Sequence, residues 1–190
     1  MKRLIMKKVI IFLVVCMATL PAFSQRYLPG QTGLHINAGG INGFMSDAFY
    51  LNAGLSKYTE KANRWIYEVE YLQKKLSYNE ILIPVAQFTA EGGYYLNFLS
   101  DRSKTFFFSI GGSVMAGYES VNWDKKVLYN GASIENKDGF IYGGAVGFEI
   151  ETFFADRVIL LTNLRERILF GSTVNKFHFQ LGLGLKIIIN

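Results

Sequence analysis

The sequence predicts an all-β protein: an eight-stranded antiparallel up-and-down β-barrel of the outer-membrane type, preceded by a cleaved signal peptide. Three observations lead to this fold. Apolar and polar residues alternate with a period of two over most of the chain, the strands so marked are long, and short connections alternate with longer ones. Because 190 residues suit one domain, we expect a signal peptide over residues 1–24 and a single β-barrel domain over residues 25–190.

The N-terminus shows the three regions of a secretory signal peptide. A cationic stretch precedes an apolar run over residues 9–20, and a small-residue cleavage site follows at Ala22-Phe23-Ser24. The cations are Lys2, Arg3, Lys7 and Lys8. The apolar run is shorter than the ~20 residues that a spanning helix needs, so cleavage and export are favoured over a retained N-terminal anchor.

Removing this leader changes the charge balance of the chain. The formal charge of +5 falls to +1, because 16 Lys and Arg then face 15 Asp and Glu. No cationic cluster larger than a pair remains, so the mature chain has no electrostatic footprint for nucleic acid. The single cysteine lies in the leader, which excludes a disulfide within the mature chain.

Turn residues divide the remaining chain into eight predicted strands. These span residues 33–40, 48–58, 63–75, 80–98, 104–119, 139–154, 157–170 and 176–189. The fourth contains Pro84 near its start, where we expect a bulge or an unpaired rim position, because proline cannot donate a ladder hydrogen bond.

Alternation of apolar and polar residues supports four of these strands directly. In the third strand, residues 65–71 place aromatic and branched side chains at odd positions, opposed by Glu68 and Glu70 on the other face. The fifth strand alternates in the same way over residues 106–118, and the sixth over residues 146–151. In the last strand every odd position from Phe177 to Ile189 is apolar, a segregation that no helix of period 3.6 produces.

The polar faces of these strands favour a barrel over a soluble β-sandwich, which would show the same alternation. They carry many Gly and Ser residues, which weaken a strand unless space is short, and the interior of a narrow barrel is short of space. Several strands also reach 13 residues or more, long enough for the ~9–11 residues that cross a membrane.

The connections favour the same topology. With both ends of the mature chain in the periplasm, the periplasmic side receives residues 59–62, 99–103 and 155–156, and the outer side receives 41–47, 76–79, 120–138 and 171–175. The longest connection therefore falls on the outer side, as in outer-membrane barrels. Aromatic residues such as Tyr94, Phe153 and Phe177 crowd strand ends, which suggests two interfacial belts.

Placing the apolar faces outward directs eight charged side chains into the lumen. They are Glu68, Glu70, Glu91, Glu149, Glu151, Arg165, Arg167 and Lys186. An eight-stranded barrel is just wide enough for side chains to fill, so we expect these acids and bases to pair and to leave no aqueous pore. The alternative is that they are solvated charges on the strand faces of a soluble protein.

Catalytic and metal chemistry has little support in the sequence. His35 begins the first predicted strand and His178 the last, which places the two rings at opposite ends of the barrel and excludes a shared metal ion. Ser172, His178 and Asp47 could be imagined as an acyl-transfer triad at the outer rim, but serines and acids are common in loops. We therefore predict no enzyme and no catalytic, cofactor-binding or metal-binding residues.

The long connection mixes aromatic and cationic side chains. Trp123, Lys125, Lys126 and Tyr129 could form a partner-binding tip, or they could belong to an ordinary solvated loop. The composition favours neither interpretation over the other.

Several stretches of the chain resemble a known family. Residues 25–34, Gln-Arg-Tyr-Leu-Pro-Gly-Gln-Thr-Gly-Leu, are similar to the opening of the conjugal-transfer TraO proteins of Bacteroidetes conjugative transposons. The C-terminal half is similar too, through residues 149–157, Arg165-Glu166-Arg167 with Gly171-Ser172, and Phe177-His178 leading to residues 182–186. The resemblance spans essentially the whole mature chain.

The resemblance implies a non-enzymatic cell-envelope component, at the outer membrane, of a conjugative DNA-transfer apparatus related to type IV secretion. The implied partners are other conjugal-transfer envelope proteins and outer-membrane lipid, with no direct nucleic-acid binding, no small-molecule substrate and no cofactor. The alternative function is that of a free-standing small outer-membrane barrel, which acts as an adhesin or ligand binder through residues 120–138.

Overall fold

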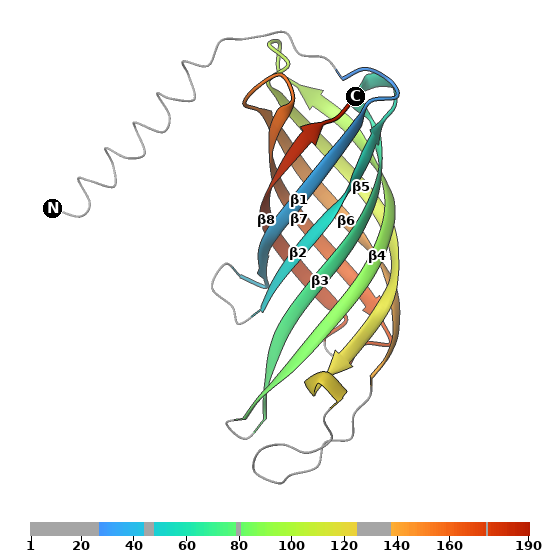
Figure 1. The fold of residues 1–190 in the computed structure, drawn as a ribbon, viewed down its shortest axis with the longest axis vertical. Helices are drawn as coiled ribbons and strands as arrows, with labels where there is room; N and C mark the ends of the chain where they lie inside the picture. The colour runs from blue at the N-terminus through green and yellow to red at the C-terminus, as the bar shows by residue number, and fades with distance from the viewer. Residues whose placement is uncertain (1–26, 44–47, 79–80, 125–137, 174) are drawn as a thin grey trace, which may run out of the picture.

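The chain folds into one closed antiparallel β-barrel of eight strands (Figure 1). The computed structural model describes residues 27–43, 48–78, 81–124, 138–173 and 175–190. The strands are β1 (Thr32–Ile41), β2 (Ala48–Tyr58), β3 (Arg64–Tyr78), β4 (Ile81–Ser100), β5 (Phe106–Val121), β6 (Gly139–Phe153), β7 (Val158–Phe170) and β8 (Phe177–Ile188). Two short 3-10 helices, η1 (Glu60–Ala62) and η2 (Asn122–Asp124), lie in connections. The predicted fold class is confirmed.

Each strand pairs with its neighbours in the sequence, and β1 pairs with β8 to close the barrel. We call the end that carries the C-terminal Asn190 the proximal end, and the opposite end, which carries η2, the distal end (Figure 1). Tyr27 lies at the proximal end, where it packs with Tyr58, Phe153 and Ile188. Proximal connections comprise residues 59–63, 101–105 and 154–157. β5 ends in η2 at the distal end, and β6 begins at the same end, as the sequence predicts.

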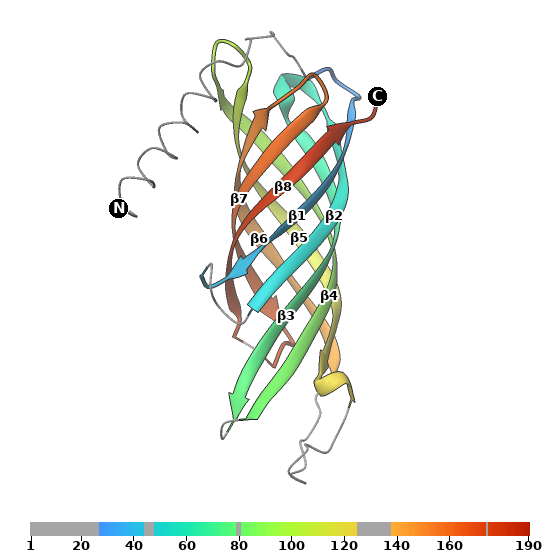
Figure 2. The same ribbon diagram turned by 60° about the vertical axis from the view of Figure 1, so that its left-hand side comes forward.

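The β3–β4 hairpin is longer than predicted, and it projects beyond the distal rim (Figure 2). Residues 76–79 were expected to form a connection, but the pairing of β3 with β4 continues to Tyr78↔Ile81. The apolar side chains of Leu76 and Ile83 pack together there and extend the hairpin. Pro84 pairs with Lys75 on β3, but it has no partner on β5, because it lies one residue beyond the last β4–β5 pair, Val85↔Val121. The rim position expected for proline is therefore unpaired on one side only.

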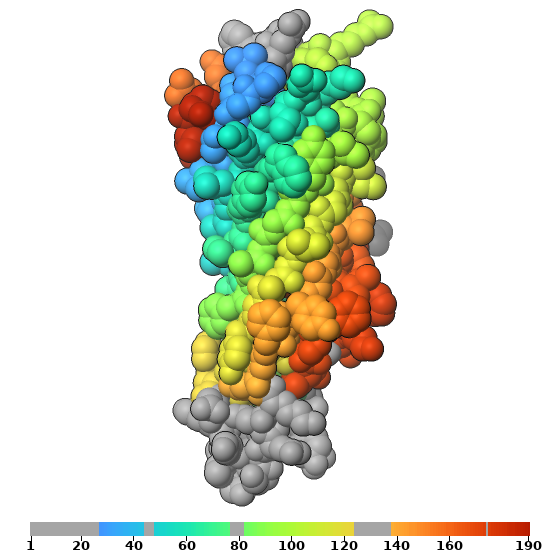
Figure 3. Space-filling model, turned by 90° about the vertical axis from the view of Figure 1, so that its right-hand side faces the viewer, coloured from blue at the N-terminus to red at the C-terminus, as the bar shows by residue number. Residues whose placement is uncertain are grey.

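The outer wall of the barrel is apolar and its interior is polar, the reverse of a soluble protein. Along β8, Phe177, Leu183 and Ile187 are exposed, whereas His178 and Lys186 are buried. Figure 3 shows this wall from one side. No helix among the described residues is long and apolar enough to cross a membrane.

Glycines on the inward face let large side chains cross the narrow lumen. A Cβ atom at Gly182 would collide with the Tyr50 hydroxyl, and one at Gly184 would collide with the Asn37 amide. The polar faces are therefore rich in glycine because space inside the barrel is short.

Candidate functional site: the charged interior of the barrel

Charged side chains fill the middle of the barrel. All eight residues that the alternation directs inward are buried, and they come from five strands. They are Glu68 and Glu70 on β3, Glu91 on β4, Glu149 and Glu151 on β6, Arg165 and Arg167 on β7, and Lys186 on β8. Because an unpaired buried charge is strongly destabilising, the partners of these groups determine what the interior can do.

A central cluster is organised around Arg165. Its Nη2 atom lies 2.5 Å from Glu70 Oε2, and its Nη1 atom lies 3.2 Å from both Glu68 Oε2 and Glu91 Oε1. The Nε atom donates a hydrogen bond of 3.0 Å to Gln180. One side chain on β7 therefore bridges three carboxylates on β3 and β4, on another part of the barrel wall.

Arg167 extends this cluster toward the distal end. Its guanidinium pairs with the Glu70 carboxylate and donates a 3.1 Å hydrogen bond to the Thr89 hydroxyl. The Gln180 amide donates to the same carboxylate at 3.0 Å. Glu70 is thus held by both arginines and by an amide.

A second cluster lies nearer the proximal end. Arg64 contacts Glu149 at 2.6 Å and Glu151 at 3.4 Å, and Lys186 contacts Glu151 at 2.5 Å and Glu149 at 3.4 Å. The Tyr58 hydroxyl donates to Glu151 at 2.7 Å. Two cations and two carboxylates therefore neutralise one another within this layer of the lumen.

Two members of these clusters, Arg64 and His35, were missing from the predicted set, as was the buried Glu119 at the distal end. His35 Nε2 lies 2.8 Å from Glu68 Oε1, and the Ser56 hydroxyl lies 3.3 Å from His35 Nδ1. The alternation did contain the signal for both. Arg64 shares the even-numbered face of β3 with Glu68, and His35 stands between two apolar, outward-facing residues of β1.

An aromatic cluster closes the proximal mouth. The Tyr27 ring stacks on the Tyr58 ring with centroids 3.8 Å apart, and it also contacts Phe107 and Phe153. Burial, and after it the charge of Glu151, raises the pKa of the Tyr27 hydroxyl, so this side chain is a neutral phenol. The segment that leads into β1 therefore acts as a lid over the ion pairs.

Replacing Tyr27 by Leu should lower the free energy of unfolding by about 0.5–1.5 kcal/mol, because the new side chain keeps apolar bulk but loses the stacked ring pair. Urea unfolding of the refolded barrel in lipid measures this loss. The exposed Leu28 provides the control, since Leu28→Ala should change stability by less than about 0.5 kcal/mol. Equal stability of the two variants would show that Tyr27 does not close the mouth.

Hydrogen bonds to Glu119 hold the connection between β7 and β8 at the distal end. Glu119 Oε2 accepts a 2.5 Å hydrogen bond from the Ser172 hydroxyl, and Oε1 accepts a 2.7 Å hydrogen bond from the Thr173 amide. The Gln87 amide donates to Oε2 at 2.7 Å. The Glu119 carboxylate on β5 therefore holds the β7–β8 connection in place across the distal end of the lumen.

The structure does not assemble the triad that was considered for acyl transfer. The Ser172 hydroxyl donates to Glu119, and neither ring nitrogen of the buried His178 has a hydrogen-bond partner among the described residues. Asp47 lies outside those residues. His35 pairs across the sheet with Lys186, and His178 with Arg167, which places the two rings at different heights of the barrel.

Metal ligands do not gather anywhere in the described part of the chain, where no group of three His, Cys, Asp or Glu residues could hold an ion. Of the proposed partner-binding residues, Trp123 follows β5 within η2, with a left-handed φ of 54° and 52% exposure. The other three, Lys125, Lys126 and Tyr129, lie outside the described residues.

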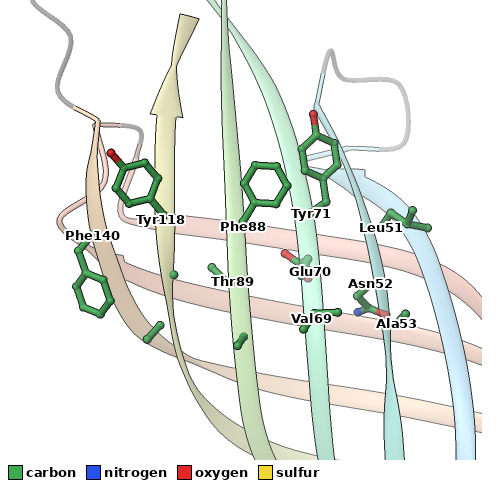
Figure 4. A pocket seen from close by; sticks show the side chains of 13 residues that line it. Leu51, Asn52, Ala53, Val69, Glu70, Tyr71, Phe88, Thr89, Tyr118 and Phe140 are labelled. Carbon is green, nitrogen blue, oxygen red and sulfur yellow. The ribbon is translucent and has the colours of Figure 1, made fainter. Parts of the chain in front are cut away.

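The outer wall has a recess of about 680 Å³ across β2 to β6 (Figure 4). Small side chains such as Ala53, Ala90 and Ala116 form part of its lining, and rings such as Phe88 and Tyr118 border it. The only charged residue beside it, Glu70, has its carboxylate bound by arginines inside the barrel. The recess is therefore a hydrocarbon surface without catalytic groups.

Two solved structures of surface proteins are similar to this barrel. Neisserial surface protein A has a TM-score of 0.56 and 14% identity, covering 84% of this chain and 97% of its own. Ail, the attachment invasion locus protein of Yersinia pestis, has a TM-score of 0.54 and 6% identity, covering 85% and 99%. At these identities the likeness concerns the fold alone.

Comparison with protein families identifies the family of this chain. No curated protein matches the sequence. The family described as "Conjugative transposon protein TraO" matches residues 28–189, nearly the whole barrel from the segment before β1 to the residue after β8. This match confirms the resemblance seen in the sequence, and the chain belongs to the conjugative transposon TraO family.

Proposed function

We propose that the protein is a non-enzymatic, outer-membrane component of the conjugative DNA-transfer apparatus of a conjugative transposon. The observation that carries the proposal is the family match over residues 28–189. The apolar outer wall supports a position in the membrane, because in water it would leave large hydrophobic side chains exposed on every strand. The proximal end, which carries Tyr27 and Asn190, would face the periplasm.

The interior supports a structural role over a pore or an enzyme. Two layers of ion pairs fill the lumen, and an aromatic cluster and the Glu119 hydrogen bonds lie at its two ends. Every predicted lumen charge has an opposite charge within 4 Å. Partners would then be other transfer proteins of the envelope, bound at the outer surfaces of the barrel.

A second candidate function is ligand binding through the long distal connection. The exposed Trp123 at the distal rim favours it, since an aromatic ring is a common anchor in recognition. Copurification with the other transfer proteins of the transposon would favour the apparatus, and isolation as a lone barrel would favour the ligand binder.

Deletion of the gene should abolish transfer, whereas His178→Ala and Ser172→Ala should each retain it within a few-fold. The reason is that loss of a catalytic group removes orders of magnitude in rate without unfolding the protein, whereas a structural subunit tolerates such changes. Transconjugants are counted beside the deletion strain, and heat-modifiable migration reports whether the barrel is folded. A folded His178→Ala protein with transfer as low as the deletion would reject the structural role.

A further inference from the structure

One acidic side chain of the strands lies on the apolar outer face of the barrel. Glu166 stands between Arg165 and Arg167 on β7, and because both arginines point into the lumen, Glu166 points outward. Its cross-strand partners are Val146 on β6 and Phe179 on β8, both exposed on the apolar wall. The carboxylate therefore belongs to the surface that the proposed function assigns to lipid.

The position of Glu166 along the strand places it inside the apolar band. Leu164 precedes it and Ile168 follows it on the same outward face of β7, and the aromatic Phe170 lies two outward positions farther toward the distal end. On β6 the aromatic Tyr142, which pairs with Phe170, marks the same distal level. Glu166 thus lies short of the distal aromatic residues, where acyl chains would surround it.

An ionised carboxylate in hydrocarbon is costly, and ionisable residues inside membranes mark functional sites because they are kept for a partner. Among the described residues Glu166 makes no ion pair, and the side chains beside it on all sides are apolar. The described part of the barrel therefore does not supply the partner. The nearest polar neighbour on the same face is Thr162, two outward positions toward the proximal end.

We propose that this surface, the outward side chains of Val146, Thr162, Glu166 and Phe179, docks a membrane-embedded segment of another transfer protein. That segment would present a Lys or Arg side chain to Glu166 and apolar side chains to its neighbours. The inference rests on the proposed function, since it assumes a barrel in the membrane and an assembly to join.

A second copy of this chain fits the surface poorly. Within the described strands, the outward-facing cations are Lys57 and Lys75, and the other exposed cations of the described chain lie in the connections at the two ends. Lys57 pairs with Trp65 at the proximal end, and Lys75 lies on the projecting hairpin, so neither is level with Glu166. A symmetric dimer through this face would place two glutamates opposite each other, which is repulsive.

The test compares Glu166→Leu with Val114→Leu, a control on the outward face of β5. Each full-length variant replaces the native protein in donor cells that carry the complete transposon. The other transfer proteins that copurify with it are quantified, and the urea midpoint of the isolated barrel in lipid is measured. We expect Glu166→Leu to lose copurification of at least one transfer protein by tenfold or more while its urea midpoint stays unchanged or rises. Val114→Leu should keep both properties.

Retained copurification in Glu166→Leu would overturn the docking surface, as would a lowered urea midpoint, because the carboxylate would then support the barrel itself. Loss of a dimer of this chain, without loss of any other transfer protein, would overturn the choice of partner. The proposed function fails separately: in that case deletion of the gene leaves transfer intact and no transfer protein copurifies with the native barrel.

Discussion

Replacing Arg165 by Met should lower the free energy of unfolding by about 3–5 kcal/mol, the cost typical of breaking a buried ion pair by removing one partner. Arg165 is the common partner of Glu68, Glu70 and Glu91. Met fills similar space without charge, so the loss would come from carboxylates left in a closed lumen. Glu68 retains His35 and Glu70 retains Arg167, but Glu91 retains no cation among its described contacts.

Urea unfolding in lipid measures the loss, and the exposed Arg157 at the β6–β7 connection provides the matched control. Arg157→Met should change stability by less than about 0.5 kcal/mol. Adding Glu91→Gln to Arg165→Met should recover part of the loss, because it removes the carboxylate that has no other cation. If the two single Met variants unfold at the same urea concentration, the lumen charges are hydrated and the interior is not closed.

The direction of each side chain could be predicted from the sequence, because alternation of period two fixes which face of a strand a residue occupies. That rule also applied to Arg64 and Glu166. Arg64 stands at the very start of β3, where a single residue shows no alternation, and Glu166 stands between two arginines whose charges dominate that segment.

The ion pairs themselves could not be predicted from the sequence. Arg165 and Glu68 are separated by 97 positions, and they meet only because the registers of all the intervening strands bring β7 and β3 to facing sides of one lumen. An error of one residue in any of those registers would change the partner. The distal hairpin was missed for a more local reason: Ser77 and Asn79 indicate a turn, but the pairing of Leu76 with Ile83 extends the strands past it.

The second large effect on the free energy of unfolding is expected from a substitution on the outer wall of the barrel. Replacing Leu183 by Arg should lower the free energy of unfolding in lipid by about 2–4 kcal/mol, the cost of a cation on the lipid face near the midplane. Leu183 is 51% exposed and lies in the middle of β8, where it pairs with Ala38 on β1 and Thr162 on β7.

The matched control places the same charge on the same face of the same strand. Ile187 is equally exposed but lies next to the proximal end of β8, where Ile187→Arg should cost only about 0–1 kcal/mol, because a long side chain reaches the interface there. Urea unfolding of both variants in lipid vesicles gives the difference. A barrel that stands in water would tolerate both arginines alike, since each would only replace an exposed leucine or isoleucine. A difference between the two positions therefore measures how deeply the wall is set in hydrocarbon, and equal costs would contradict the membrane position on which the proposed function depends.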